Sequence, residues 1–186
     1  MKNRGGFHYS VACVRNDKAE ELVVQLNRTF PAERGRIFIP AKEVWMRGWR
    51  EIATKTLFPG YIFVHTDMNR QELHEFIRDN RGVVRTYVRE LGIARDLMAG
   101  DDPYRKNGIE FNDLNEDETE YLDHMLDDDD IIRMSVGHIE NGWAVVEKGP
   151  LKGWEDRIFR VNRHDRVAFL TVEFRGHRMS AGLELK

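Results

Sequence analysis

Strand-like and helix-like spacings of apolar residues alternate along the first half of the chain. Three strands are predicted, in "FHYSVACV", "RIFIP" and "GYIFVHT". Apolar residues at helical spacing predict a helix from Asp17 to Pro31, and a second short helix from about Asn69. "GVVRTYV", residues 82–88, is predicted as a further strand.

A hairpin and a third helix complete this half. "KEVWMRGWREI" has two aromatic-bearing arms around Arg47-Gly48, which predicts a projecting hairpin. Residues 100–113 are polar and predict a loop, while Asn115 with Glu118 resembles a capping box that begins another amphipathic helix. The order of elements predicts an α+β sandwich, with helices against a mainly antiparallel sheet.

The last third has a different pattern. Five short strand-like runs, separated by Gly-containing or polar turns, follow Ile131 and predict a small SH3-like β-barrel. We therefore predict two domains, residues 1–126 and 131–186, joined by the acidic run 127–130. That run is read as a linker or a fraying helix end, because four adjacent carboxylates repel one another. It lacks the ligand spacing of a divalent-ion loop, so no metal site is expected.

Composition narrows the class of protein. The chain has 186 residues, a formal net charge of −3, no apolar run long enough to span a bilayer and no signal-peptide pattern, so a soluble cytoplasmic protein is predicted. The single cysteine, Cys13, excludes a disulfide framework and is predicted to be a small buried residue. Residues 131–186 carry ten Lys or Arg against seven Asp or Glu, and this sign asymmetry favours nucleic acid as a partner.

"TLFPGYIFV", residues 56–64, places a Pro-Gly pair inside an apolar run. Pro59 fixes its own φ and Gly60 permits a positive φ, so a turn is predicted before a strand that begins at Tyr61. Phe58 then lies on the corner. Two interpretations remain open on local grounds: an ordinary corner that leads into a core strand, and an aromatic corner used for docking.

These residues carry a resemblance to a known family. "LFPGYIFV" after a charged hairpin resembles the NusG N-terminal domain, and "VVEKGPLKGWEDRIFRVNRHDRVAFLTVEF" resembles the KOW motif of that family's SH3-like C-terminal domain. "GPLKG", "NRHDRVA" and "SAGLEL" are similar to the subgroup of antiterminators typified by LoaP. The family usually opens its first strand with Trp-Tyr, whereas this chain has His8-Tyr9.

The resemblance implies a transcription elongation factor whose first domain binds the clamp helices of RNA polymerase. The residues implied in polymerase binding are Phe58, Pro59, Tyr61 and Tyr9. The resemblance also implies that the hairpin tip lies near the upstream DNA fork and contacts nontemplate DNA through Arg47, Trp49 and Arg50; cations beside an aromatic suit single-stranded nucleic acid in general. Packing at the edge of the fold explains Trp45 equally well. Phe174 is the implied contact for a ribosomal protein or the terminator Rho.

In the predicted barrel, cations follow two strands and their connections, beside one tryptophan. The candidates for contact with a nascent RNA hairpin are Lys152, Trp154, Arg157, Arg160, Arg163, His164 and Arg166. A solvated basic face, with Trp154 covering the barrel core, explains the same pattern and stays open as an alternative.

The main hypothesis is a monomeric, processive antiterminator without cofactor, metal or membrane contact. One rival is an RNA-binding KOW protein of ribosome assembly with no polymerase contact. Another is an enzyme with an SH3-like accessory domain. Catalysis is not expected, because His164, Asp165 and Ser180 do not make a triad by sequence adjacency and no nucleotide-binding or metalloprotease motif is present.

Overall fold

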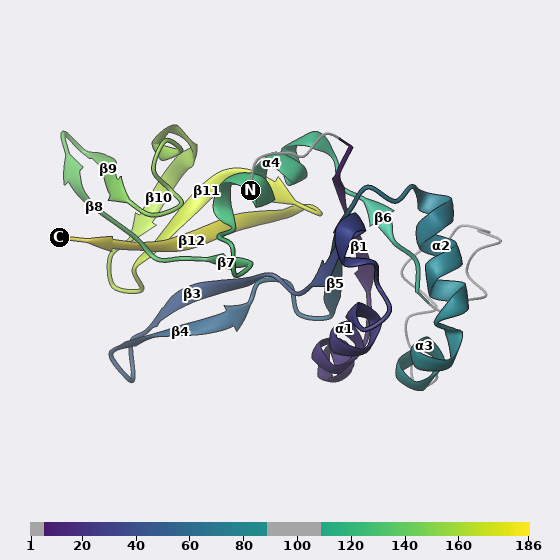
Figure 1. The fold of residues 1–186 in the computed structure, drawn as a ribbon. Coiled ribbons are helices and arrows are strands. Elements are labelled where there is room, and N and C mark those ends of the chain that lie inside the picture. Colours follow the sequence, from purple (N-terminus) through teal and green to yellow (C-terminus); the bar gives the residue numbers. More distant parts are fainter. Residues whose placement is uncertain (1–5, 89–108) are drawn as a thin grey trace. The chain divides into compact units, whose positions relative to one another are not determined.

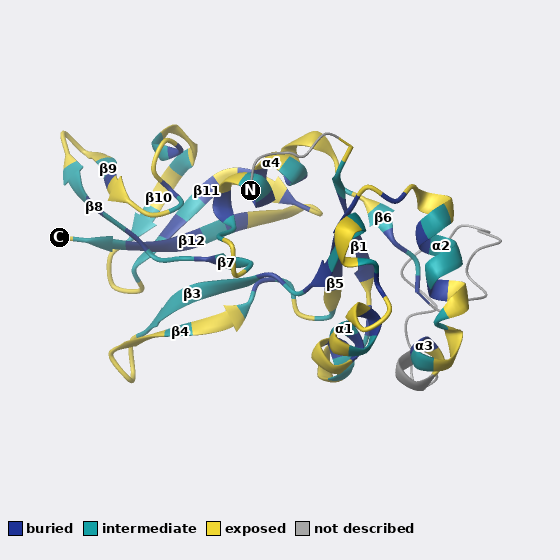
Figure 2. Cartoon of the chain, in the orientation of Figure 1, coloured by how far each residue is buried: buried dark blue, intermediate teal, exposed yellow. Residues whose placement is uncertain are grey.

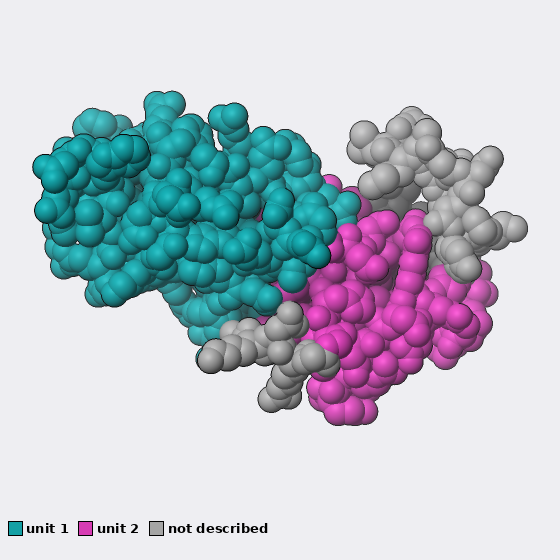
Figure 3. Space-filling model, turned by 90° about the horizontal axis from the view of Figure 1, so that it is seen from above, with its two compact units in different colours: residues 1–2, 40–57, 115–186 teal, residues 3–39, 58–114 magenta. Residues whose placement is uncertain are grey.

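The computed structural model describes residues 6–88 and 109–186. Two compact units make up the structure (Figure 3). Within the described residues, the sandwich unit consists of 6–39, 58–88 and 109–114, and the barrel unit of 40–57 and 115–186. Both units contain strands and helices, so the predicted α+β class is confirmed (Figure 1). None of the helices in the described part is long and apolar enough to cross a membrane.

An antiparallel sheet in the order β2-β5-β1-β6 forms one layer of the sandwich unit. Its strands are β1 (His8–Cys13), β2 (Gly35–Phe38), β5 (Tyr61–Thr66) and β6 (Asn112–Asp113). Helices α1 (Ala19–Asn27), α2 (Arg70–Asp79) and α3 (Arg81–Val88) complete the unit, with short 3-10 turns at Asn16–Lys18 and Ala32–Arg34. Alternate strand residues such as Ala12, Ile62 and Val64 share one core with Leu22 and Ile77 of the helices.

The segment predicted as a strand at 82–88 is helical, which corrects the prediction. The backbone N–H of Val84 donates to the carbonyl of Asn80, so α3 follows α2 after a break of one residue. Val84 is fully buried in the core formed by the helices and the sheet, while Arg81 and Gly82 are exposed. Packing of one helical face against α1 overrides the strand preference of valine. The predicted loop at 100–113 lies mostly outside the described residues.

Cys13 is exposed, although its apolar neighbours predicted burial. It is the last residue of β1 and pairs with Tyr61, which is also exposed. At this end of β1 the sheet face that carries Cys13 and Tyr61 is therefore exposed, while Ala12 and Ile62 are buried on the opposite face. Partial burial still raises the pKa of the Cys13 thiol.

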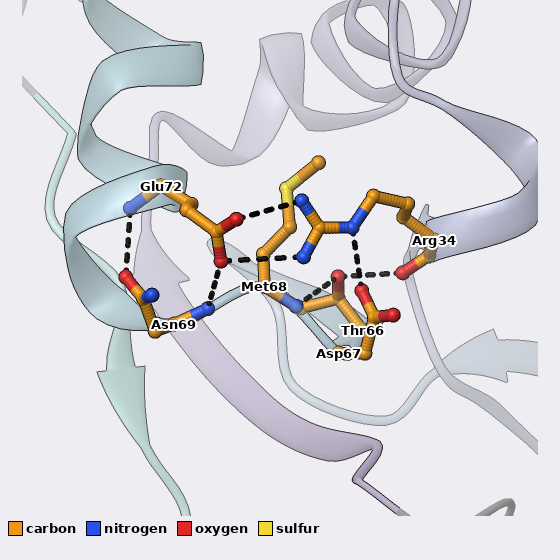
Figure 4. Close-up of polar contacts among 6 residues, drawn as sticks. All are labelled: Arg34, Thr66, Asp67, Met68, Asn69 and Glu72. Atoms are coloured by element: carbon orange, nitrogen blue, oxygen red, sulfur yellow. Dashed lines mark hydrogen bonds and ion pairs between the residues drawn. The ribbon is translucent and has the colours of Figure 1, made fainter.

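Arg34 joins the start of β2 to the end of β5 (Figure 4). Its guanidinium donates to Asp67 at 2.8 Å and to both carboxylate oxygens of Glu72 at 2.8 and 3.2 Å. Glu72 also accepts the Asn69 N–H, and the Asn69 side chain accepts the Glu72 N–H, which makes the capping box of α2. The start of α2 is therefore attached to the start of β2 and to the end of β5, the strand that begins at the Pro-Gly corner.

This cluster predicts an acid-dependent contribution to stability. Hydrogen bonds from Arg34 and from the Asn69 N–H hold the pKa of the Glu72 carboxyl below its usual value. The stabilisation is present above the ordinary Glu pKa of about 4.3 and is lost as the pH falls through the lower pKa of the folded protein. We expect Glu72→Gln to have a lower melting temperature than wild type at about pH 7. At about pH 3 the melting temperatures of the two proteins should approach each other.

Thermal denaturation at the two pH values checks this expectation, with Glu20→Gln on the exposed side of α1 as control. Equal losses for Glu72→Gln at both pH values would show that the charge on Glu72 is not the source of the stability.

The barrel unit is built on a curled five-stranded sheet in the order β10-β11-β12-β8-β9. The strands are β8 (Ser135–Glu140), β9 (Trp143–Lys148), β10 (Ile158–Asn162), β11 (Val167–Phe174) and β12 (His177–Leu185). All neighbours are antiparallel except β12 and β8, which are parallel. The five strands and the SH3-like size predicted for this segment are confirmed.

The predicted hairpin is also part of the barrel unit. It consists of β3 (Ala41–Met46) and β4 (Glu51–Thr56), and β3 pairs in parallel with β7 (Ile131–Ile132). Strand β4 is largely exposed, in contrast to the buried β5 of the other unit (Figure 2). Helix α4 (Glu116–Met125) begins at the predicted capping box of Asn115 and Glu118, which is confirmed.

The acidic run forms a defined turn between α4 and β7. The Asp127 carboxylate accepts the N–H groups of Asp129 and Ile131 and pairs with the Arg133 guanidinium. Asp130 adopts a positive φ of 61°, and its carbonyl accepts the Ala41 N–H. Whether residues 1–126 and 131–186 fold as separate domains stays a prediction.

Candidate functional site

The Pro-Gly corner is a hydrogen-bonded turn in the sandwich unit. Tyr61 N–H donates to the Phe58 carbonyl at 3.2 Å, and Gly60 has the positive φ of 83° that the turn requires. The Gly60 carbonyl accepts the Val14 N–H, and its own N–H donates to the Asn16 side chain. These contacts fix the backbone of the corner to the segment that follows β1.

The side chains of the corner differ in burial. Pro59 is exposed, Tyr61 is 38% exposed and Phe58 is half-buried. The Phe58 ring stacks on the buried Phe63 ring with centroids 5.7 Å apart. Phe58 therefore belongs partly to the core and partly to the surface, which combines the two interpretations of the sequence.

Tyr9 lies at the other end of the sheet from the corner. It pairs with His65 across β1 and β5 and stacks on that ring at 4.3 Å, whereas Tyr61 pairs with Cys13. Tyr9 and Cys13 are four positions apart on β1, a distance of about 13 Å. The structure thus brings Phe58, Pro59 and Tyr61 together at the corner. Tyr9 is only 6% exposed and belongs to the buried aromatic layer of the sheet.

The hairpin tip presents the three predicted side chains to solvent. Arg47, Trp49 and Arg50 are exposed, Trp49 to 73%. Trp45, lower on the hairpin, is covered by the guanidinium of Arg166, which lies 3.7 Å from the ring centroid. Fold-edge packing therefore accounts for Trp45, and the tip keeps one aromatic between two cations.

The predicted cations of the barrel unit differ in their exposure to solvent. Exposed side chains are those of Lys152, Arg157, Arg160, Arg163 and His164. Arg166 is half-buried, pairs with Glu184 at 2.5 Å and lies over Trp45, so its charge is partly compensated within the fold. Arg163 and Arg166 also line a cavity of about 380 Å³ with Lys186, a cation that the sequence pattern did not single out.

Trp154 is not on the surface. It is 8% exposed, and the His124 ring of α4 stacks on it with centroids 4.4 Å apart and planes within 6°. Arg157 lies 5.7 Å from the same ring. A base that stacked on the face held by His124 would have to displace that ring first.

Phe174 lies beneath α4. It is 2% exposed, and its ring is 6.4 Å from that of Tyr121. The carboxylate of Glu118, itself buried, accepts the N–H of Arg175 at 3.0 Å. In this arrangement a protein partner could reach Phe174 only after α4 moves.

Comparison with known proteins bears on the segment that contains the corner. The family model described as "Transcription termination factor nusG" matches residues 8–95. Residues 8–95 are therefore similar in sequence to a NusG-family domain. The match begins with β1, includes the hairpin and the Phe58–Tyr61 corner, and ends after α3.

A solved structure titled "Domain interaction in Thermotoga maritima NusG" is also similar. The two chains share 16% sequence identity, and the superposition has a TM-score of 0.47. The matched region covers 96% of this chain and 94% of the Thermotoga maritima chain. The comparison with curated proteins finds no match.

Proposed function

We propose that this protein is a transcription elongation factor that acts as a processive antiterminator. Its sandwich unit binds RNA polymerase at the clamp helices. The observation that supports this proposal is the NusG-family domain at residues 8–95, whose Phe58–Tyr61 corner is a rigid, partly exposed aromatic turn.

The geometry of the corner suits a protein interface. Phe58 rests on Phe63, and Gly60 is bonded to Val14 and Asn16, so little conformational entropy remains to be lost on binding. Aromatic anchors of this kind dominate the binding energy of many interfaces. The proposed polymerase contacts are Phe58, Pro59 and Tyr61, with Tyr9 as support behind them.

The barrel unit supplies a second set of proposed contacts. Exposed Lys152, Arg157, Arg160 and Arg163 suit the phosphates of a nascent RNA hairpin. The hairpin tip, with Trp49 73% exposed, suits nontemplate DNA. A ribosomal protein or Rho remains a proposed partner for Phe174 once α4 is released. The proposal includes no enzymatic step, and its LoaP-like antitermination role rests on the motifs in "GPLKG", "NRHDRVA" and "SAGLEL".

Polymerase capture and terminator readthrough test the proposal together. Immobilised full-length protein is expected to retain purified RNA polymerase, and adding the protein to a transcription reaction is expected to raise readthrough of a terminator downstream of a structured RNA. Failure to retain polymerase, together with binding to ribosomal RNA, would support the rival role in ribosome assembly. Retention of polymerase with increased pausing would contradict antitermination while keeping the elongation-factor role.

A further inference from the structure

A β-bulge in the barrel unit exposes the side chain of Phe159 to solvent. On β10, Ile158 pairs with Leu170 of β11 while Arg160 pairs with the preceding residue, Phe169, so Phe159 is the extra residue between two pairs. Bulges re-aim side chains that regular alternation would send to the opposite face. Both Phe159 and Arg160 are therefore exposed, although they are neighbours in sequence.

Two arginine–phenylalanine pairs surround the bulge. Phe159 is 49% exposed, and the guanidinium of Arg178 on β12 lies 5.2 Å from its ring centroid. The guanidinium of Arg160 lies 5.6 Å from the ring of Phe169, and the two phenylalanine rings are 6.3 Å apart. We name these four residues, Phe159, Arg160, Phe169 and Arg178, the Phe-Arg platform.

The platform lies on the outward face of the sheet. Along β11 the even-numbered residues Ala168, Leu170 and Val172 are buried, so Phe169 belongs to the alternate, outward set. Arg178 is opposite Glu173 at 3.9 Å, and both side chains are more than half exposed. A surface pair of this kind is weak, so Glu173 does not keep Arg178 from a stronger anion.

Trp143, another exposed aromatic of the five-stranded sheet, has different neighbours. Trp143 on β9 is 72% exposed and pairs with Glu140 across β8. Further along the same two strands His138 contacts Glu147. That surface is acidic and disfavours phosphate. The platform, by contrast, combines the exposed Phe159 ring and the half-buried Phe169 ring with two guanidinium groups.

We propose that the Phe-Arg platform binds single-stranded RNA. An unpaired base stacks on Phe159 beside Phe169, and Arg160 and Arg178 hold the phosphates on either side. Base stacking on aromatic side chains between cations is how proteins bind single strands, whereas the bases of a duplex are already stacked on one another. This inference rests on the proposed RNA contact of the barrel unit and adds which part of the RNA is held, an unpaired segment.

Phe159 variants of the full-length protein test the proposal against an oligouridine of about ten nucleotides. Fluorescence anisotropy measures its affinity and the dependence of affinity on salt. We expect Phe159→Ala to weaken binding about tenfold, with an unchanged salt slope, because a stacking contact carries no charge. Phe159→Trp is expected to restore wild-type affinity. Arg178→Ala is expected to weaken binding and to flatten the slope by about 0.7.

The matched control is Trp143→Ala, which removes a more exposed aromatic from the same sheet and is expected to leave oligouridine binding unchanged. Circular dichroism verifies that each variant is folded. Equal affinity of wild type, Phe159→Ala and Trp143→Ala for oligouridine would overturn the platform. If those three proteins still bound an RNA hairpin and Arg163→Ala weakened that binding, the proposed RNA role would stand without the platform. If the wild-type protein bound no RNA, both the platform and the proposed RNA contact of the barrel unit would be overturned.

A blunt RNA duplex serves as the second probe. We expect the Phe159→Ala change to affect duplex affinity little, because a paired base cannot leave the helix without cost. An equal loss of duplex and oligouridine affinity would show that Phe159 acts on RNA in general and would overturn the single-strand specificity.

Discussion

Replacing Phe58 by alanine is expected to weaken binding of RNA polymerase about thirtyfold, equivalent to about 2 kcal/mol. The ring is half-buried and stacks on Phe63, so its truncation removes both the anchor of the corner and part of the sheet's aromatic layer. The expected folding cost is about 1–2 kcal/mol, below the roughly 3–5 kcal/mol of a fully buried phenylalanine. Polymerase affinity measured well below the melting temperature separates the two effects.

Phe76 provides a matched control for this experiment. It is also half-buried in the sandwich unit, and its ring lies 5.0 Å from Phe30 in the core shared with the helices. We expect Phe76→Ala to lower stability by a similar amount and to leave polymerase affinity unchanged. Circular dichroism of the helices follows stability in both variants. A Phe58→Ala protein that melts early and still binds polymerase at wild-type affinity would contradict the docking role.

Replacing Tyr121 by alanine is expected to have the largest effect on stability. The side chain is fully buried and contacts the rings of Trp154 and Phe174. Its removal should lower the free energy of unfolding of the barrel unit by about 3–5 kcal/mol, since a cavity would remain between α4 and the sheet.

Tyr121→Phe is the informative partner of this change. Within the described part of the chain the Tyr121 hydroxyl is buried and has no hydrogen-bond partner, and burial raises the pKa of Tyr121 above its ordinary value. Deleting an unpaired buried hydroxyl should leave stability unchanged or raise it by about 1 kcal/mol. A large loss for Tyr121→Phe would reveal a hydrogen bond to this hydroxyl.

Tryptophan fluorescence during urea unfolding measures both Tyr121 variants. Trp45, Trp49, Trp143 and Trp154 are the four tryptophans of the chain, and all lie in the barrel unit. The signal therefore reports unfolding of that unit without a contribution from tryptophan in the sandwich unit. If Tyr121→Ala unfolded as wild type does, the packing of α4 on the sheet would not stabilise the unit.

Local chemistry was sufficient to predict the elements with strong sequence signals. Pro59-Gly60 permits one kind of turn, and Asn115 with Glu118 forms the cap that its spacing predicts, because these conformations depend on neighbouring residues. The helical spacing after Asp17 and the short strands after Ile131 also follow from the period of the apolar residues. The Phe58–Tyr61 corner could be predicted from the sequence because its turn also depends only on neighbouring residues.

Contacts between distant residues decided the rest. Residues 81–88 are helical because Val84 reaches a core formed with α1 and the sheet, which overrides a local preference for strand. Glu118 meets Arg175 across 57 positions, so no local pattern shows that α4 covers Phe174 or that His124 covers Trp154. The exposure of Phe159 depends on a register shift between β10 and β11, and register is set by pairing in the folded sheet. The sequence by itself thus determined which elements form and where the corner lies, while tertiary packing decided which aromatic side chains remain available to a partner.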